Sequence, residues 1–165
     1  MIKNLLVLLI VFGSLISCNQ LETTTYYLIR HAEKDRTDTL NKNPNLNGKG
    51  LERAKKWTAY FKDINIDAVY STKYNRTIQT AKPIAKSKKL NIQNYDPRRM
   101  YDSIFKINTK GKTVLVVGHS NTTPVFANKI LEKDIYENMD DHDNASLYIV
   151  TVTGDKKTSS IEKVE

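Results

Sequence analysis

The sequence alternates between segments typical of β-strands and segments typical of α-helices. Residues 24–29 read TTYYLI, a run of β-branched and aromatic residues that favours a strand. Residues 113–117 read TVLVV, and such a continuous apolar run is typical of a strand buried on both faces. Strands that alternate with helices form a mainly parallel sheet covered by helices. We therefore predict an α/β fold, a three-layer α/β/α sandwich with a mainly parallel central sheet.

Apolar periodicity and turn residues predict the remaining elements. The predicted helices cover 50–62, 73–89, 99–107 and 122–131, and the further strands cover 66–71, 91–95, 146–153 and 158–164. We expect the last two strands to form a terminal antiparallel pair that turns at Gly154-Asp155. Thr72 is expected to cap the second helix through its hydroxyl, and Pro83 to kink or interrupt that helix.

The N-terminal segment differs from the rest of the chain. Lys3 is the one charged residue in 1–17, and an apolar run covers 5–16. As a helix this run would span about 18 Å at ~1.5 Å per residue, whereas a bilayer core requires about 30 Å. A basic start followed by a short apolar core and small residues is typical of a secretory signal. Residues 1–17 are therefore predicted to be a signal peptide.

The lone cysteine of the chain directly follows this apolar core. The segment Leu15-Ile16-Ser17-Cys18 resembles a bacterial lipobox, in which the cysteine becomes the lipidated first residue of the mature chain. The alternative is a structural cysteine at the end of an anchor helix. We expect residues 18–165 to form a single domain with a core of about 24–153. The lipobox implies export and a lipid anchor at Cys18, on the periplasmic or cell-surface face of a bacterial membrane.

Composition limits the classes of partner. The chain has 26 Lys and Arg against 18 Asp and Glu, a net charge of +8, which raises the question of nucleic-acid binding. The lysines are dispersed among acidic residues, and no aromatic stripe for base stacking stands out, so we expect no nucleic-acid partner. With one cysteine in the whole sequence, an internal disulfide scaffold is excluded.

Basic side chains follow three of the predicted strands. Arg30 and His31 follow the first strand, Arg76 lies shortly after the strand 66–71, and His119 follows the strand 113–117. Ligands of open α/β sheets bind outside the carboxyl ends of the strands. The planar donor fork of arginine matches phosphate oxygens, and a neutral imidazole can act as a nucleophile. These residues predict phosphoryl transfer to a histidine, without a metal or other cofactor.

Four ordered segments resemble the signatures of the histidine phosphatase (phosphoglycerate-mutase-like) superfamily. They are Arg30-His31-Ala32-Glu33, Leu46-Asn47 with Gly50, Arg53 and Ala54, Tyr70-Ser71-Thr72 with Arg76-Thr77 and Thr80-Ala81, and Gly118-His119-Ser120. The resemblance implies that His31 is the nucleophile and becomes phosphohistidine. It also implies that Arg30, Arg76 and His119 form the phosphate pocket, with Asn47 as a substrate-binding residue.

The chain departs from the family pattern at the general acid. Many members have a glutamate after the third strand, but this sequence has no glutamate between Glu52 and Glu132. Asp96 and Asp102 are the nearest candidates. The chain is in this respect similar to the compact branch that contains the phosphohistidine phosphatases. We expect a monomer that acts on a small phosphorylated substrate or a phosphoprotein.

Two other functions remain open from the sequence. Residues 118–122 resemble the G-x-S-x-G nucleophile elbow of α/β-hydrolases, which would make Ser120 the nucleophile of a serine esterase. The last glycine of that motif is replaced by Thr122, and His142 is the one histidine that follows. The second alternative is a lipoprotein that binds phosphate without turnover. The acidic run 140–143 could ligate a metal, but we expect a solvated loop over the pocket.

Overall fold

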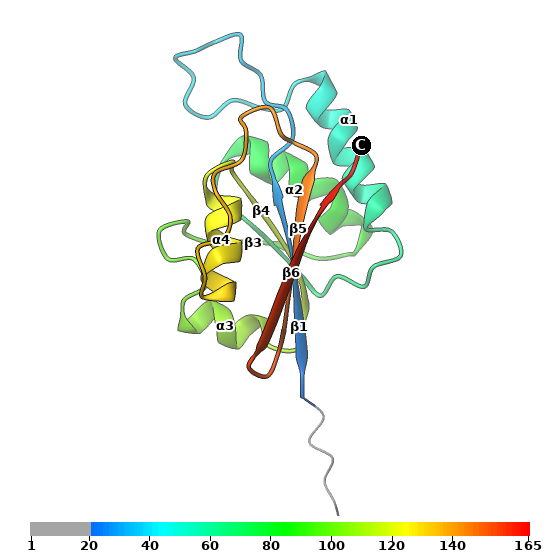
Figure 1. Ribbon diagram of the computed structural model, residues 1–165. Coiled ribbons are helices and arrows are strands. Elements are labelled where there is room, and N and C mark those ends of the chain that lie inside the picture. Colours follow the sequence, from blue (N-terminus) through cyan, green and yellow to red (C-terminus); the bar gives the residue numbers. More distant parts are fainter. Residues whose placement is uncertain (1–20) are drawn as a thin grey trace, which may run out of the picture.

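The computed structural model describes residues 21–165, which form a six-stranded sheet with helices on both faces (Figure 1). The strands are β1 (Thr23–Arg30), β2 (Ala68–Ser71), β3 (Ile92–Asn94), β4 (Thr113–Gly118), β5 (Ser146–Thr153) and β6 (Lys156–Lys163). The helices are α1 (Gly48–Tyr60), α2 (Asn75–Ser87), α3 (Ser103–Thr109) and α4 (Thr122–Leu131). The predicted signal peptide and Cys18 lie outside the described residues. Across residues 21–165, no helix combines the length and the apolar character that a membrane crossing requires.

The strand order is β3-β2-β4-β1-β5-β6, in which the first four strands are parallel. β5 runs antiparallel to β1, and β6 runs antiparallel to β5, with their turn at Gly154 in the left-handed region (φ +57°). The predicted fold class is thus confirmed. β1 and β4 pair so that Arg30 lies opposite Gly118. Since both strands end there, the residues that follow them emerge side by side.

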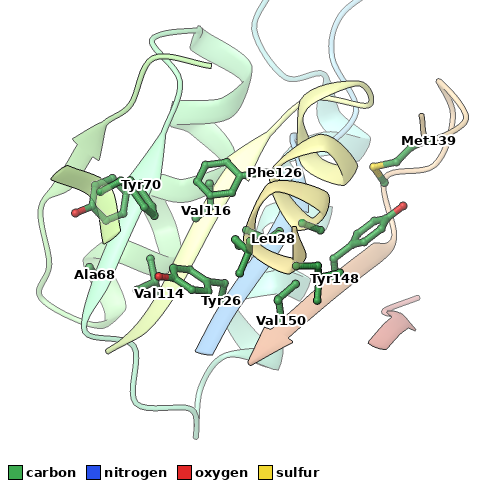
Figure 2. Close-up of a cluster of buried hydrophobic side chains, with 14 residues drawn as sticks. Tyr26, Leu28, Ala68, Tyr70, Val114, Val116, Phe126, Met139, Tyr148 and Val150 are labelled. Atoms are coloured by element: carbon green, nitrogen blue, oxygen red, sulfur yellow. The ribbon is translucent and has the colours of Figure 1, made fainter. Parts of the chain in front are cut away.

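Two apolar layers hold the helices on the sheet. On one face, α1 and α2 cover β1, β2 and β4 through a cluster that includes Trp57, Phe61 and Ile84, all fully buried. On the other face, α3 and α4 pack against the sheet through Phe105, Phe126 and their neighbours. Figure 2 shows this second cluster, in which Phe126 lies over side chains of β1 and β4. The two packed layers hold the helices firmly against the sheet and so support the ends of its strands.

Three local predictions were wrong. Tyr74, not Thr72, is the N-cap residue of α2, and the Thr72 hydroxyl bonds to other side chains. Pro83 lies inside α2 without interrupting it, because buried residues on both sides of it, Ala81 and Ile84 among them, anchor the helix to the core. The third helix begins at residue 103, because Asp102 caps it by accepting a hydrogen bond from the amide of Phe105 at 2.9 Å.

Candidate active site

The ends of β1 and β4 bring two histidine rings together. His31 follows β1 and His119 follows β4, and their ring centroids lie 5.4 Å apart. Arg76 reaches the same place from the first turn of α2, where its Nη2 lies 3.4 Å from Nδ1 of His119. The parallel sheet thus assembles residues that are far apart in the sequence, because the carboxyl ends of its strands share one edge.

His31 is held in one orientation and one tautomer. Its amide donates to the carbonyl of Gly118 at 2.9 Å, and its own carbonyl accepts from the side chain of Asn144 at 2.7 Å. The ring Nδ1 lies 2.7 Å from the carbonyl oxygen of Ala32. Because a carbonyl can only accept, Nδ1 carries the proton, and the lone pair of the ring is on Nε2. The ring borders a cavity of about 540 Å³.

The imidazole of His31 is neutral at physiological pH. Burial is the main cause that lowers its pKa to about 3, and the positive charges of Arg30 and Arg76 act in the same direction. The bond to the Ala32 carbonyl opposes these effects in part. A buried neutral ring with a lone pair beside the cavity is the state that a nucleophilic histidine requires.

His119 is fixed through a chain of side-chain hydrogen bonds. Since Arg76 can only donate, Nδ1 of His119 is the acceptor of that contact, and its Nε2 carries the proton. Nε2 lies 3.0 Å from the hydroxyl of Thr72, which in turn lies 3.0 Å from the hydroxyl of Thr77. Burial, followed by the charges of Arg76 and Arg30, lowers the pKa of His119 to about 4. The hydroxyl of Thr72 therefore orients His119 rather than capping α2.

The two arginines of the site are bound differently. Arg30 is 1% exposed, and its Nη1 donates to the carbonyls of Asp140 and Asp143 at 2.9 and 3.3 Å, while its Nη2 pairs with the carboxylate of Asp141. Arg76 lies over the ring of Tyr74 at 4.5 Å, and its Nε and Nη1 have no hydrogen-bond partner among the described residues. Arg76 therefore retains Nε and Nη1 as donors for an anion, whereas Arg30 contacts the loop after α4 through both terminal nitrogens and retains Nε, which has no partner among the described residues.

Asn47 and Glu33 build the loop beside His31. The side chain of Asn47 caps α1 by accepting from the amide of Gly50 at 2.9 Å, and it borders the same cavity as His31. Glu33 pairs with Arg53 at 2.9 Å, and both side chains are mostly buried. A Cβ at Gly50 would lie 2.1 Å from the carbonyl oxygen of Glu33, so this position requires glycine. The predicted substrate-binding Asn47 thus also has a structural role.

The two candidate general acids lie outside the cavity that His31 borders. Asp96 pairs with Arg98 at 2.9 Å on the surface, and its hydrogen bonds to the side chain and amide of Arg98 lower its pKa, so that it stays ionised. It borders a separate groove, which also contains Thr72. Asp102 caps α3, as described above, and pairs with Arg99. Neither aspartate lines the cavity that His31 borders.

The residues of the alternative functions are not assembled into a second site. The hydroxyl of Ser120 forms no hydrogen bond with a histidine in the described part of the chain, and His142 is 88% exposed beside Asp140. No group of three or more His, Cys, Asp or Glu side chains within residues 21–165 is arranged to hold a metal ion. The acidic run is not a solvated loop throughout, because Asp141 pairs with Arg30 and Asp143 pairs with Lys163.

Several residues of the site escaped sequence reasoning. Asn144, Asp141 and Thr72 contact the site, but only Thr72 belongs to a motif that marks it. Thr80 accepts a hydrogen bond from the amide of Ala32 at 2.9 Å and so ties α2 to the segment after β1. The motif threonine at position 80 was a usable signal for this contact, and the acidic run 140–143 was one for Asp141, whereas no local pattern marks Asn144.

A buried and a half-buried histidine, both neutral, lie with two arginines at one edge of an α/β sheet, which is an arrangement suited to handling phosphate. The family model of the histidine phosphatase superfamily (branch 1) matches residues 26–98. This match confirms, over those residues, the resemblance to the superfamily that the sequence predicted, and it supports the predicted phosphatase activity. A comparison with curated proteins found no match.

Solved structures share the fold. A mycobacterial glucosyl-3-phosphoglycerate phosphatase in complex with VO3 has a TM-score of 0.68 at 10% identity, covering 86% of this chain and 100% of that chain. A phosphoglycerate mutase from Bacillus anthracis has a TM-score of 0.64 at 17% identity, covering 88% and 94%. A protein assigned as the phosphohistidine phosphatase SixA from Agrobacterium tumefaciens has a TM-score of 0.60 at 17% identity, covering 84% and 97%. At these identities the likeness establishes the fold alone.

Proposed function

We propose that this phosphatase hydrolyses phosphomonoesters or related phosphoryl compounds through a phosphohistidine formed on His31. The observation that carries the proposal is the contact between Nδ1 of His31 and the carbonyl of Ala32, which leaves a lone pair on Nε2 in a buried ring. Arg76, which contacts His119, supports it with two unpartnered nitrogens. No residue of the proposed chemistry requires a metal or another cofactor.

The reaction has two steps. In the first, the Nε2 lone pair of His31 forms a bond to phosphorus while the bond to the leaving oxygen breaks in line with it, and the leaving oxygen takes up a proton from solvent. Donors on Arg76 and Arg30 stabilise the negative charge that spreads over the equatorial oxygens. In the second step, water attacks phosphorus, the phosphorus–nitrogen bond breaks, and inorganic phosphate leaves with a neutral His31 restored.

The substrate is proposed to be a small phosphorylated compound or a phosphoprotein. Two structural neighbours are named for the phosphorylated compounds they act on, glucosyl-3-phosphoglycerate and phosphohistidine. The groove beside Thr72 and Tyr74 leaves space for a part of the substrate beyond the phosphate.

We further propose export and lipid attachment at Cys18. A Cys18→Ser variant should lose lipid labelling with radioactive palmitate, and unchanged labelling would refute the anchor.

Trapping the intermediate tests the mechanism. After brief mixing with a ³²P-labelled phosphomonoester in EDTA, the wild-type chain should carry acid-labile, base-stable label, and a His31→Ala variant should carry none. Hydrolysis of p-nitrophenyl phosphate in the same buffer should match hydrolysis without EDTA. Loss of activity in EDTA would contradict the metal-free mechanism. Cleavage of p-nitrophenyl acetate that is abolished by Ser120→Ala would indicate the esterase instead.

A further inference from the structure

The cavity at His31 is larger than a phosphoryl group requires. Its volume of about 540 Å³ falls within the range of small-molecule sites, roughly 300–1,000 Å³. Beyond His31 it extends over residues 33–37, the start of α1 and the loop 141–144. The part of the cavity away from the ring therefore has room for another portion of the substrate, and its charges decide which portion fits.

Two of the carboxylates that line this cavity are occupied by groups of the protein. Glu33 pairs with Arg53 at 2.9 Å, and both side chains are mostly buried. Asp35 accepts hydrogen bonds from the amide and the hydroxyl of Thr37 at 2.9 and 2.8 Å. Neither carboxylate compensates a lysine of the cavity.

The third carboxylate, Asp141, is shared between two arginines. One oxygen pairs with Arg30, and the other lies 2.7 Å from Nη2 of Arg36. One negative charge therefore faces two positive charges at this end of the cavity. Arg36 is about half-exposed, so it keeps contact with the space in front of Asp141.

Two lysines of the cavity have no carboxylate partner within the described residues. Lys34 follows Glu33 and is half-buried, and Lys49 lies in the first turn of α1. Burial lowers the pKa of Lys34, and the neighbouring charges of Arg36 and Arg76 lower it further. An anion placed beside Lys34 would reverse this cost, because an opposite charge favours the ammonium form. The positive end of the α1 dipole adds to the attraction near Lys49.

We propose that Lys34, together with Arg36 and Lys49, forms a second anion subsite, and that this enzyme prefers phosphorylated substrates that carry a second anionic group. The inference rests on the proposed phosphatase function, because the phosphoryl group at His31 sets the position of the rest of the substrate. A carboxylate or a second phosphate on the same substrate satisfies this chemistry equally.

Matched phosphonates test the subsite without requiring turnover. 3-Phosphonopropionate and propylphosphonate share the phosphonate and a similar chain length, and only the first carries a carboxylate. Their dissociation constants are measured by titration calorimetry on the full chain and on Lys34→Met, with Lys42→Met as the control. Lys42 is an exposed lysine of the same loop, and it does not line the cavity. Hydrolysis of p-nitrophenyl phosphate, which has no second anion, is measured in parallel.

The wild-type chain should bind 3-phosphonopropionate about 10-fold more tightly than propylphosphonate, a ratio expected for one partly buried charge pair. Lys34→Met should reduce that preference to about 3-fold or less, while Lys42→Met keeps the preference. Equal binding of both phosphonates by the wild type would overturn the subsite, as would a preference that Lys34→Met leaves intact. Absence of p-nitrophenyl phosphate hydrolysis would instead count against the phosphatase proposal.

Discussion

The floor of the site and the rim of the cavity that His31 borders differ in what determines their properties. The floor, defined here as Arg30, His31, Arg76 and His119, is buried or half-buried, and its hydrogen bonds fix both imidazoles as neutral tautomers. The rim, defined here as residues 34–37 and 140–142, lies in two loops and is largely exposed. Burial therefore sets the chemistry of the floor, and exposed charge sets what the rim can recognise.

The largest effect should come from the nucleophile in the floor. His31→Ala should reduce kcat for p-nitrophenyl phosphate by at least about 10⁴-fold, because it removes the lone pair that attacks phosphorus in the proposed mechanism. The control is His142→Ala in the rim, a side chain that is 88% exposed, which should change kcat by less than about 2-fold. If His31→Ala kept a tenth of the wild-type kcat, the proposal that the floor carries the chemistry and the rim does not would be wrong.

Arg76 should be the second most sensitive position. Arg76→Ala should reduce kcat by about 10²–10³-fold, since it removes donors from the charge that develops in the transition state. Arg76→Lys should recover only part of this loss, because an ammonium has no planar fork. Steady-state kinetics should give a loss of about 10-fold or less for Arg36→Ala in the rim. Equal losses for the two arginines would contradict the proposed division of roles.

The pKa values in the floor predict a stability effect. His31 and His119 have pKa values of about 3 and 4 in the folded protein, whereas an unfolded histidine has a pKa of about 6.5. Below pH 6.5 these histidines bind protons in the unfolded chain but stay neutral in the folded protein. The free energy of unfolding therefore falls as the pH falls towards 4. Urea unfolding measures how steeply the free energy of unfolding depends on pH between pH 4 and 6.5. In His31→Gln this dependence should be weaker by up to about 1.4 kcal/mol per pH unit.

Above pH 6.5 the stability curves of the wild type and His31→Gln should run parallel, because neither state of His31 then binds a proton. This interval is the internal control, since it separates a lost packing contact from a lost titration. The same slope in both proteins between pH 4 and 6.5 would mean that the ring is not buried as a neutral group.

The smallest effects are expected at the two aspartates outside the floor. Asp96→Asn should change kcat for an alkyl phosphate by less than about 2-fold, since Asp96 is ionised and bound to Arg98 on the surface. Asp102→Ala should lower the free energy of unfolding by about 1 kcal/mol, because it removes the cap of α3, and leave kcat unchanged. The alkyl phosphate is chosen for Asp96→Asn because a poor leaving group makes kcat sensitive to a general acid. A 10-fold loss of kcat in Asp96→Asn would restore Asp96 as a candidate general acid.

Local sequence patterns predicted most elements but not their fine structure. The predicted helix 122–131 matches α4, and the strand 146–153 matches β5, because apolar periodicity and flanking turn residues act over short distances. The third helix begins four residues later than predicted, because the side chain of Asp102 accepts a hydrogen bond from the amide of Phe105 and so caps the helix at that point. Pro83 is tolerated because buried neighbours in the core hold α2 together.

The sequence by itself determined the elements, the mainly parallel sheet and the residues of the floor, since these depend on short-range periodicity and on motifs at strand ends. Only the tertiary structure decided that Thr72 orients His119 and that Asp141 binds Arg30 across 111 positions of sequence. It also decided that Asp96 lies away from the cavity of His31. Such contacts join loops whose paths depend on the packed core, so no local pattern in the chain encodes them.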